Sequence, residues 1–171
     1  MQVKKAVIPA AGYGTRMLPL TKALPKEFVP IVDKPSIQFL VEEAAASGIE
    51  DVLIIVSRGK ELIESHFDRC PELEAKLEKG GKAKQLEQIL GIAGLANVFF
   101  IRQPEMRGTG AAIRLARPFT GDEPFVVLYG DDVIMGEDPV AAQLIRAYGE
   151  TGRPCVGIKE VSREAIRKYS S

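Results

Sequence analysis

The sequence predicts an α/β protein with three layers, in which helices cover both faces of a mostly parallel, mixed sheet. Short apolar segments of strand length alternate along the chain with segments of helical periodicity. Most of the short segments are apolar throughout, as expected of strands that are buried on both faces. Repeated strand–helix–strand units call for right-handed crossovers and parallel pairing. With 171 residues, 46% of them hydrophobic, the chain can bury one sizeable core, and we expect a single domain.

The individual elements follow from local patterns, taken in chain order. Strands are predicted over residues 6–9, 52–56, 98–101, 125–129 and 155–158. The first helix is predicted from apolar residues spaced at i, i+3, i+4, i+7 and i+8, namely Ile37, Leu40, Val41, Ala44 and Ala45. Gly48 is expected to close this helix as a C-terminal cap residue. Further helices are predicted over residues 60–67, 82–91, 111–117, 140–148 and 163–168, and the charged run 72–84 is expected to be a solvated helical face.

Charge and composition argue against several classes of partner. The chain has 23 Lys and Arg residues and 23 Asp and Glu residues, without a block of like charge. We therefore expect small molecules as partners, and neither nucleic acid nor an anionic membrane. The N-terminal residues run directly into the first strand without a cleavable apolar leader, so a cytoplasmic location is expected. Cys70 and Cys155 lack metal-ligand spacing and are predicted to be ordinary thiols.

The loop after the first predicted strand, residues 10–27, has the composition of a phosphate-binding site. In parallel α/β sheets, ligands bind beyond the carboxyl ends of the strands, where this first loop lies. Gly12 and Gly14 allow backbone N–H groups to approach phosphate oxygens, and Arg16 and Lys26 add positive charge. A nucleoside triphosphate fits this combination. The loop is not a dinucleotide fingerprint, because a methionine stands where the third glycine belongs, and it is not a Walker A loop.

Two further strand ends carry residues that suit nucleotide chemistry. The side-chain amide of Gln103 can read a base edge; the alternative is a plain loop in which Thr109 caps a helix that begins near Gly110. Asp131 and Asp132 follow a later apolar strand, and their carboxylates suit Mg²⁺. The alternative for this pair is a polar strand end, or Asp132 as the cap of a turn.

The first loop also carries a long and specific pattern, Gly12-x-Gly14-Thr15-Arg16-x-Leu18-Pro19-x-Thr21-Lys22-x-x-Pro25-Lys26-Glu27. This pattern resembles the signature loop of the sugar-phosphate nucleotidylyltransferases. The resemblance implies the Rossmann-like αβα fold of that family. It also implies a nucleotide-binding set that consists of Ala10, Ala11, Gly12, Gly14, Thr15, Glu27, Gln103 and Gly108.

The resemblance assigns roles within this set. Ala11, Gly12 and Glu27 contact the base, and residues 14–16 wrap the β- and γ-phosphates. Gln103 pairs with uracil above Gly108. The catalytic residues that it implies are Arg16, Lys26 and Asp131, with Mg²⁺ bound by Asp131 and, less centrally, by Asp132. A lysine near the α-phosphorus agrees with the need to stabilise charge during displacement.

Residues 62–82 resemble an insertion of the uridylyltransferase branch of this family. This resemblance implies transfer of a uridylyl group from UTP to glucose 1-phosphate, with release of pyrophosphate. Thymidylyl transfer to the same sugar phosphate and a non-catalytic nucleotide-binding module are the alternatives. His66, the only histidine, lies in this segment and is expected to pack a helix.

The family resemblance also sets an expectation for the extent of the site. In the family, residues that contact the sugar, a second metal-binding aspartate and the last strands follow the part that matches this sequence. We therefore expect residues 1–171 to be the nucleotide-binding portion of a single domain whose C-terminal part is missing. These residues are expected to bind nucleotide without transferring it. Members of the family form dimers or tetramers, so a homo-oligomer is also expected.

Overall fold

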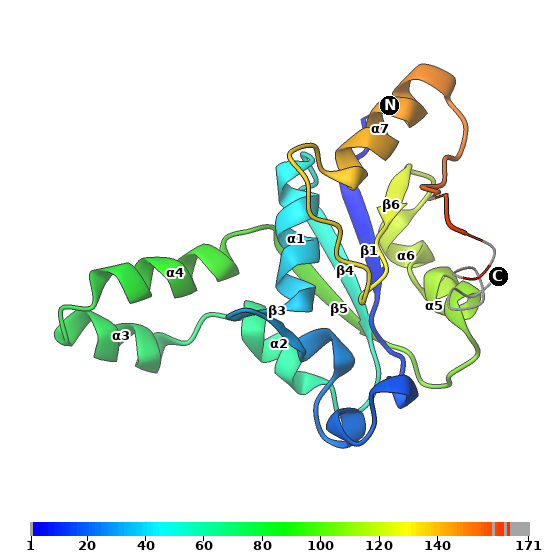
Figure 1. Ribbon diagram of the computed structural model, residues 1–171. Coiled ribbons are helices and arrows are strands. Elements are labelled where there is room, and N and C mark those ends of the chain that lie inside the picture. Colours follow the sequence, from blue (N-terminus) through cyan, green and yellow to red (C-terminus); the bar gives the residue numbers. More distant parts are fainter. Residues whose placement is uncertain (1, 159, 163, 165–171) are drawn as a thin grey trace.

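The computed structural model describes residues 2–158, 160–162 and 164. Its main sheet has the strand order β5-β4-β1-β6 and consists of β1 (Lys5–Pro9), β4 (Asp51–Val56), β5 (Asn97–Arg102) and β6 (Phe125–Val127). All three strand pairings are parallel. The two central strands are almost fully buried, as their apolar composition predicts. The predicted α/β fold with a parallel sheet is confirmed (Figure 1).

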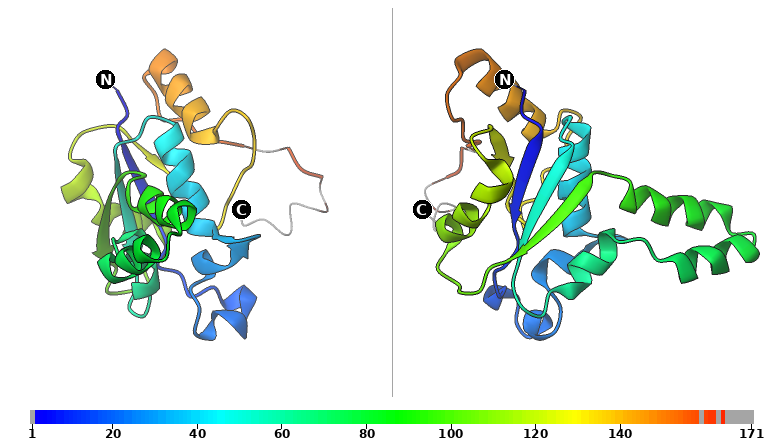
Figure 2. Two further views of the ribbon diagram at one scale, coloured as in Figure 1. Left: turned by 90° about the vertical axis from the view of Figure 1, so that its left-hand side faces the viewer. Right: turned by 180° about the vertical axis from the view of Figure 1, so that it is seen from behind.

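Helices cover both faces of the sheet, because successive side chains of a strand point to opposite sides. On one face, α1 (Ser36–Ala46), α2 (Glu61–Phe67) and α7 (Val140–Thr151) pack on strand residues that include Ala6 and Ile8. On the other face, α5 (Thr109–Leu115) and α6 (Arg117–Thr120) pack around Val7 and Ile55. Figure 2 shows the sheet between these two layers. The prediction of three layers is therefore confirmed.

Helix α1 ends as the sequence predicts. Gly48 has a φ of 82°, a backbone conformation that residues with a Cβ rarely adopt. Its N–H donates to the carbonyl oxygen of Ala45, and the N–H of Ile49 donates to that of Ala44. This pair of hydrogen bonds is the Schellman motif, which satisfies the last carbonyl groups of the helix. Ile49 is buried in the same core as α1, so the cap also directs the chain into β4.

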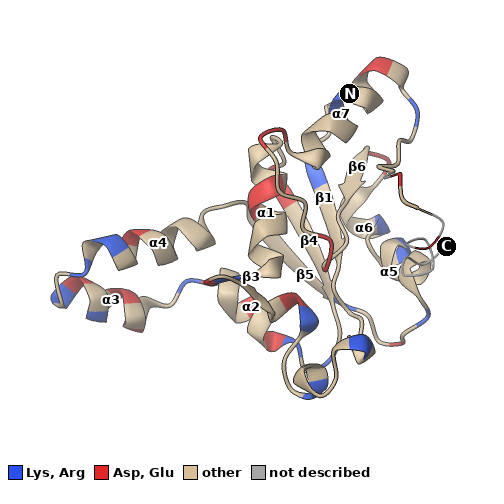
Figure 3. Ribbon diagram, in the orientation of Figure 1, with Lys and Arg blue, Asp and Glu red and all other residues tan. Residues whose placement is uncertain are grey.

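Helices α3 (Pro71–Lys79) and α4 (Ala83–Ala93) form a hairpin that projects from the rest of the molecule (Figure 1). Neither helix has a buried residue. Lysines and glutamates are mixed along the hairpin, as Figure 3 shows, and all of them are exposed except Glu74, which pairs with Arg69. The predicted solvated helical face over residues 72–84 is confirmed.

Some predicted elements differ from the structure. Residues 155–158 do not form a strand, because no described strand pairs with them, and Val156 and Ile158 are 82% and 94% exposed. Strand β6 is shorter than the predicted range 125–129. The predicted helix over residues 163–168 lies almost entirely outside the described residues. A minimal hairpin of β2 (Pro30–Ile31) and β3 (Lys34–Pro35) was not predicted, since two-residue strands carry no periodicity.

Within the part of the chain that the structure describes, none of the helices is long and apolar enough to cross a membrane.

The two cysteines do not form a disulfide: both Cys70 and Cys155 are free thiols, as predicted.

His66 packs at the junction of α1, α2 and the segment before β2. Its ring makes edge-on contacts with Phe28 and Phe67. Its Nε2 lies 3.0 Å from Oε1 of Gln38, whose own side-chain nitrogen donates to Glu42. Because the Gln38 oxygen is left as an acceptor, His66 donates from Nε2. The expectation that His66 packs a helix is confirmed.

This environment predicts a pH dependence of stability. Burial lowers the pKa of His66 from its ordinary value of 6.5, so the folded chain resists protonation of the ring more than the unfolded chain does. The neutral His66 ring therefore contributes fully to the stability of the fold above about pH 6.5. This contribution is lost as the pH falls through the lower pKa that His66 has in the folded chain. We expect His66→Gln to remove this part of the pH dependence. Urea unfolding of both proteins between pH 5 and 8 measures the free energy of unfolding at each pH. The prediction is contradicted if this free energy changes with pH equally in the two proteins.

Candidate functional site

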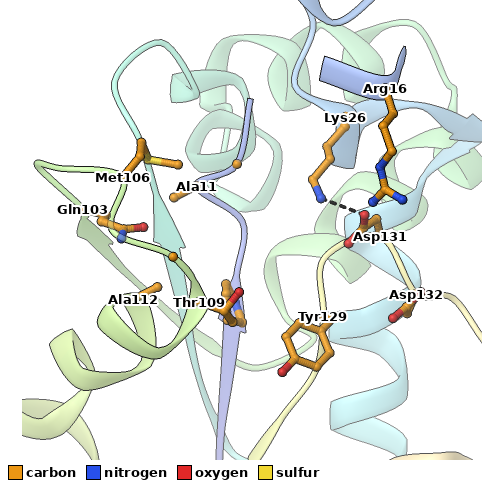
Figure 4. Close-up of a pocket in the computed structure, with 13 residues that line it drawn as sticks. Ala11, Arg16, Lys26, Gln103, Met106, Thr109, Ala112, Tyr129, Asp131 and Asp132 are labelled. Carbon is orange, nitrogen blue, oxygen red and sulfur yellow. Dashed lines mark ion pairs between the residues drawn. The ribbon is translucent and has the colours of Figure 1, made fainter. Parts of the chain in front are cut away.

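A pocket of about 680 Å³ opens at the carboxyl ends of the parallel strands. Its wall is built by the three segments that follow β1, β5 and β6, which approach one another because their strands share one sheet (Figure 4). The lining residues are Pro9, Ala11, Gly12, Arg16, Lys26, Gln103, Met106, Gly108, Thr109, Ala112, Tyr129, Asp131 and Asp132. The volume falls within the usual range for small-molecule sites.

The first loop leaves β1 as a continuation of the sheet. The N–H of Ala10 donates to the carbonyl oxygen of Ile55 at 2.8 Å, which extends the parallel ladder by one residue. The chain then turns back on itself, and the hydroxyl of Thr21 donates to the carbonyl oxygen of Gly14 at 2.8 Å. Three short 3₁₀ turns follow, η1 (Thr15–Met17), η2 (Leu20–Lys22) and η3 (Lys26–Phe28). The loop is therefore a folded structure with defined internal bonds.

A run of backbone donors in this loop is free. Among the described residues, no acceptor receives the N–H groups of Ala11, Gly12, Tyr13 or Gly14. Backbone N–H groups away from regular structure are ordinarily paired with protein, water or ligand. Successive free N–H groups in a glycine-containing loop form a concave site for an anion. This arrangement agrees with the phosphate-binding composition of the loop.

Two cations and the carboxylate of Asp131 meet at one side of the pocket. Nζ of Lys26 lies 2.7 Å from Oδ2 of Asp131, with the two side chains 18% and 41% exposed. The Arg16 guanidinium points towards the same place (Figure 4) and forms no ion pair with another described residue. A partly buried lysine and an exposed arginine that forms no ion pair within the described part of the chain make a favourable site for an anionic ligand.

The opposite wall is less charged. Gln103 is 5% exposed, and its backbone N–H donates to the carbonyl oxygen of Val56 at 2.8 Å, which anchors it at the end of β5. Met106 and Ala112 lie beside it and provide apolar surface (Figure 4). An amide among apolar groups suits a flat heterocycle with polar edges.

Thr109 does not have the capping role considered from the sequence. Helix α5 begins at Thr109 itself, its N-cap residue is Gly108, and no side chain caps it. Gly108 has a φ of 83°, so the chain enters the helix through a conformation that leaves Thr109 inside the first turn. The side chain of Thr109 lines the pocket instead.

Asp131 and Asp132 reach the pocket from a turn that follows β6. The N–H of Leu128 donates to the carbonyl oxygen of Val7, and the N–H of Asp132 closes the turn onto the carbonyl oxygen of Tyr129 at 3.0 Å. The described residues contain no cluster of three or more His, Cys, Asp or Glu side chains that could hold a metal ion without further ligands. A site for Mg²⁺ here therefore depends on ligands supplied by water and substrate.

Eight of the predicted site residues line the pocket, and they come from all three loops. They are Ala11, Gly12, Arg16, Lys26, Gln103, Gly108, Asp131 and Asp132. The other four predicted residues, Ala10, Gly14, Thr15 and Glu27, do not line it. Ala10 is fully buried, whereas the carbonyl oxygen of Gly14 accepts from Thr21 and Thr15 is exposed.

Glu27 differs most from its predicted place. Its side chain is 0% exposed and forms an ion pair with Lys60, whose Nζ lies 2.8 Å from Oε2. Burial raises the pKa of Glu27 and lowers that of Lys60, while their mutual attraction opposes both shifts. The predicted contact of Glu27 with a base is not supported, because its carboxylate lies under the first loop. The sequence alone does not indicate that Glu27 pairs with Lys60, because the two residues belong to different segments of the chain.

Sequence reasoning also missed several lining residues. Tyr129 falls within the predicted strand 125–129, but it lies beyond the shorter observed β6 and is 49% exposed. Thr109 and Ala112 lie three positions apart, so both fall on the same face of α5. That spacing is the one signal that could have placed both at the site.

Comparison with known proteins agrees with this geometry. Residues 5–167 match the model of the nucleotidyl transferase family. A UTP–glucose-1-phosphate uridylyltransferase of Staphylococcus saprophyticus is 52% identical over 168 residues, which is 98% of this chain and 58% of that protein. The chain thus spans a little over half the length of this relative.

Solved structures give the same result. The UTP-bound UGPase of Acinetobacter baumannii matches with a TM-score of 0.83 and 38% identity over 88% of this chain and 54% of that one. A UDP-glucose pyrophosphorylase in complex with UDP-glucose matches with a TM-score of 0.85 and 38% identity over 98% of this chain and 61% of that one. The loop motif, the parallel sheet and the family match together show that this chain belongs to the nucleotidyl transferase family.

Proposed function

We propose that residues 1–171 form the nucleotide-binding part of a UTP–glucose-1-phosphate uridylyltransferase. The observation that carries the proposal is the convergence, in one pocket, of Arg16, Lys26 and Asp131 with free backbone donors of the first loop. The 52% identity with a relative of that name supports UTP over thymidine triphosphate as the nucleotide. The relative extends beyond the aligned part, and the sugar phosphate is proposed to be bound largely by that remaining portion.

The nucleotide is proposed to lie across the pocket. The base occupies the wall formed by Gln103, Met106 and Ala112, where the amide of Gln103 offers both a donor and an acceptor. The triphosphate lies along the N–H groups of Ala11 and Gly12 and reaches Arg16. Lys26, on the same side, is then near the α-phosphate. This orientation matches the apolar side of the pocket with the base and its cationic side with the charged groups.

The proposed reaction is an in-line displacement at the α-phosphorus. A phosphate oxygen of glucose 1-phosphate, already anionic at neutral pH, forms the new bond to the α-phosphorus. The bond from the α-phosphorus to the oxygen that bridges to the β-phosphate breaks, and pyrophosphate leaves with the electron pair. No side chain needs to act as a nucleophile or base. The task of the protein is to align the groups and to stabilise the charge that develops, which Lys26 and Arg16 are placed to do.

A magnesium ion fits the donor set at the end of β6. Mg²⁺ is usually held by one or two carboxylates together with waters and substrate phosphates, and Asp131 and Asp132 provide two carboxylates. When bound, it would neutralise phosphate charge and polarise the phosphoryl group. Lys26 already pairs with Asp131 at 2.7 Å, so this carboxylate lies where a cation is favoured.

The proposal predicts that UTP with Mg²⁺ binds more tightly than ATP with Mg²⁺. Gln103 is buried among apolar groups, and a site built to hydrogen-bond one base rejects a base that leaves its polar atoms unpaired. Isothermal titration calorimetry on the wild-type chain measures both affinities. Gln103→Leu is expected to weaken UTP binding about tenfold or more and to reduce the preference for UTP over ATP. The reason is that loss of a hydrogen bond that leaves a buried polar group unpaired costs about 1–3 kcal/mol. Equal or tighter binding of ATP to the wild type would contradict the assignment of the nucleotide.

A further inference from the structure

The inner side of the first loop rests on a buried lysine that does not line the pocket. Lys60 is 6% exposed and stands at the start of α2, four residues after the end of β4. Its Nζ donates to the carbonyl oxygens of Ala10 and Gly12 and to Oε2 of Glu27. The last two distances are both 2.8 Å. The position is reached because β4 is the neighbour of β1, so the segments that leave both strands meet at the same sheet edge.

The three hydrogen bonds use the whole donor capacity of the side chain. An ammonium group has three protons and no acceptor, and Lys60 has three acceptors around it. Hydrogen bonds with a charged donor are shorter and stronger than neutral ones. The ammonium is therefore held in one orientation, and it holds the two carbonyl groups in turn.

The orientation of these carbonyl groups determines where the neighbouring N–H groups point. In a trans peptide the C=O and the following N–H point in opposite directions. Because the carbonyls of Ala10 and Gly12 turn inward to Lys60, the N–H groups of Ala11 and Tyr13 turn away from it. These are two of the donors that no described residue accepts. Among the described residues, Lys60 is the only hydrogen-bond donor to these two carbonyl oxygens.

We infer that Lys60 is a positioning residue of the nucleotide pocket, which presents the N–H face of the first loop to the triphosphate by holding the carbonyls of Ala10 and Gly12. The inference rests on the function proposed above. Lys60 does not touch the nucleotide, and it acts through the backbone alone. Glu27 supplies the counter-charge that allows the ammonium to be buried.

A competing explanation is that Lys60 serves only to neutralise Glu27. The two explanations differ for a protein that lacks both charges. If Lys60 only neutralises Glu27, it is no longer needed once Glu27 is also replaced. The double variant should then bind UTP like the wild type. Positioning still requires a donor at residue 60, so a protein without both charges should remain defective.

The test compares Lys60→Met with Lys60→Met combined with Glu27→Met, each in this chain. Methionine keeps an unbranched apolar stem but removes the ammonium. We expect the single variant to bind UTP at least about tenfold more weakly, which corresponds to the loss of one charged hydrogen bond. We expect the double variant to regain stability in urea, because no uncompensated charge stays buried, while its UTP affinity remains at the level of the single variant. Lys4→Met, which removes a surface ion pair with Glu50, is the matched control and should leave UTP affinity unchanged.

Wild-type affinity in either the single or the double variant would overturn the inference. A second readout does not need the nucleotide. The amide of Ala10 is bonded to Ile55 in the folded chain, and we expect its hydrogen exchange to be at least about tenfold faster in the double variant than in the wild type. Unchanged exchange would overturn the inference as well. A wild-type chain that binds no UTP would instead contradict the proposed function, and the exchange measurement would still decide the role of Lys60.

Discussion

Lys26→Ala is expected to lower the rate of uridylyl transfer by about a hundredfold or more in the full-length enzyme proposed above. Lys26 is 18% exposed and lies 2.7 Å from Asp131, so its charge is held at the place where the α-phosphate is proposed to react. Removal of one preorganised group that stabilises developing charge typically costs a factor of about 10²–10³ in turnover. The release of pyrophosphate from UTP, glucose 1-phosphate and Mg²⁺ measures the rate.

Lys22→Ala is the matched control for this prediction. Lys22 belongs to the same loop and is exposed, and it does not line the pocket. The same substitution there should change turnover little. Equal effects of the two substitutions would show that Lys26 contributes only to the general charge of the loop. Absence of pyrophosphate release from the unmodified full-length protein would favour the alternative of a non-catalytic nucleotide-binding module.

Gly14→Val is expected to weaken UTP binding by at least about thirtyfold. Gly14 has a φ of 65°, and a Cβ at this position would lie 3.0 Å from Cβ of Lys26 and 3.1 Å from Cγ2 of Thr21. The left-handed conformation costs a residue with a side chain about 1–3 kcal/mol, and forced contacts of this kind cost a similar amount. The loop would relieve both by changing shape, which displaces Lys26 and the free N–H groups together. Calorimetry with UTP on this chain measures the effect.

Gly121→Val separates general destabilisation by backbone strain from the local change of shape in the first loop. Gly121 has a φ of 59°, but a Cβ there meets no described atom within 4 Å, and the residue does not line the pocket. Its substitution should therefore lower the free energy of unfolding while UTP affinity stays at the wild-type level. A similar loss of affinity in both variants would mean that general destabilisation explains the result at Gly14.

The sequence alone was sufficient for the central part of the fold. Strands β1 and β4 are apolar after their first residue because both faces are covered, and helix α1 carries an uninterrupted apolar stripe that ends before a glycine. Such local patterns are visible without knowledge of the partners. The segment 155–158 shows the limit of this reasoning. Its composition favours a strand, but a strand also needs a neighbour with which to pair, and none is found among the described residues.

For the site, the sequence determined the chemical groups and their order along the chain. The glycines and cations of the first loop, the amide of Gln103 and the carboxylates of Asp131 and Asp132 were all identified from residue type and from their place after strands. That they share one pocket follows from parallel pairing, which brings the carboxyl ends of all strands to one edge.

Only the tertiary structure decided which members of the motif face the pocket and which support it. Glu27 and Lys60 are 33 residues apart, and their pairing beneath the first loop depends on the adjacency of β1 and β4. A one-dimensional pattern does not distinguish a carboxylate that faces a ligand from one that is buried against a distant lysine. The distinction arises because a buried charge requires a partner, and that partner comes from whichever segment the sheet places alongside.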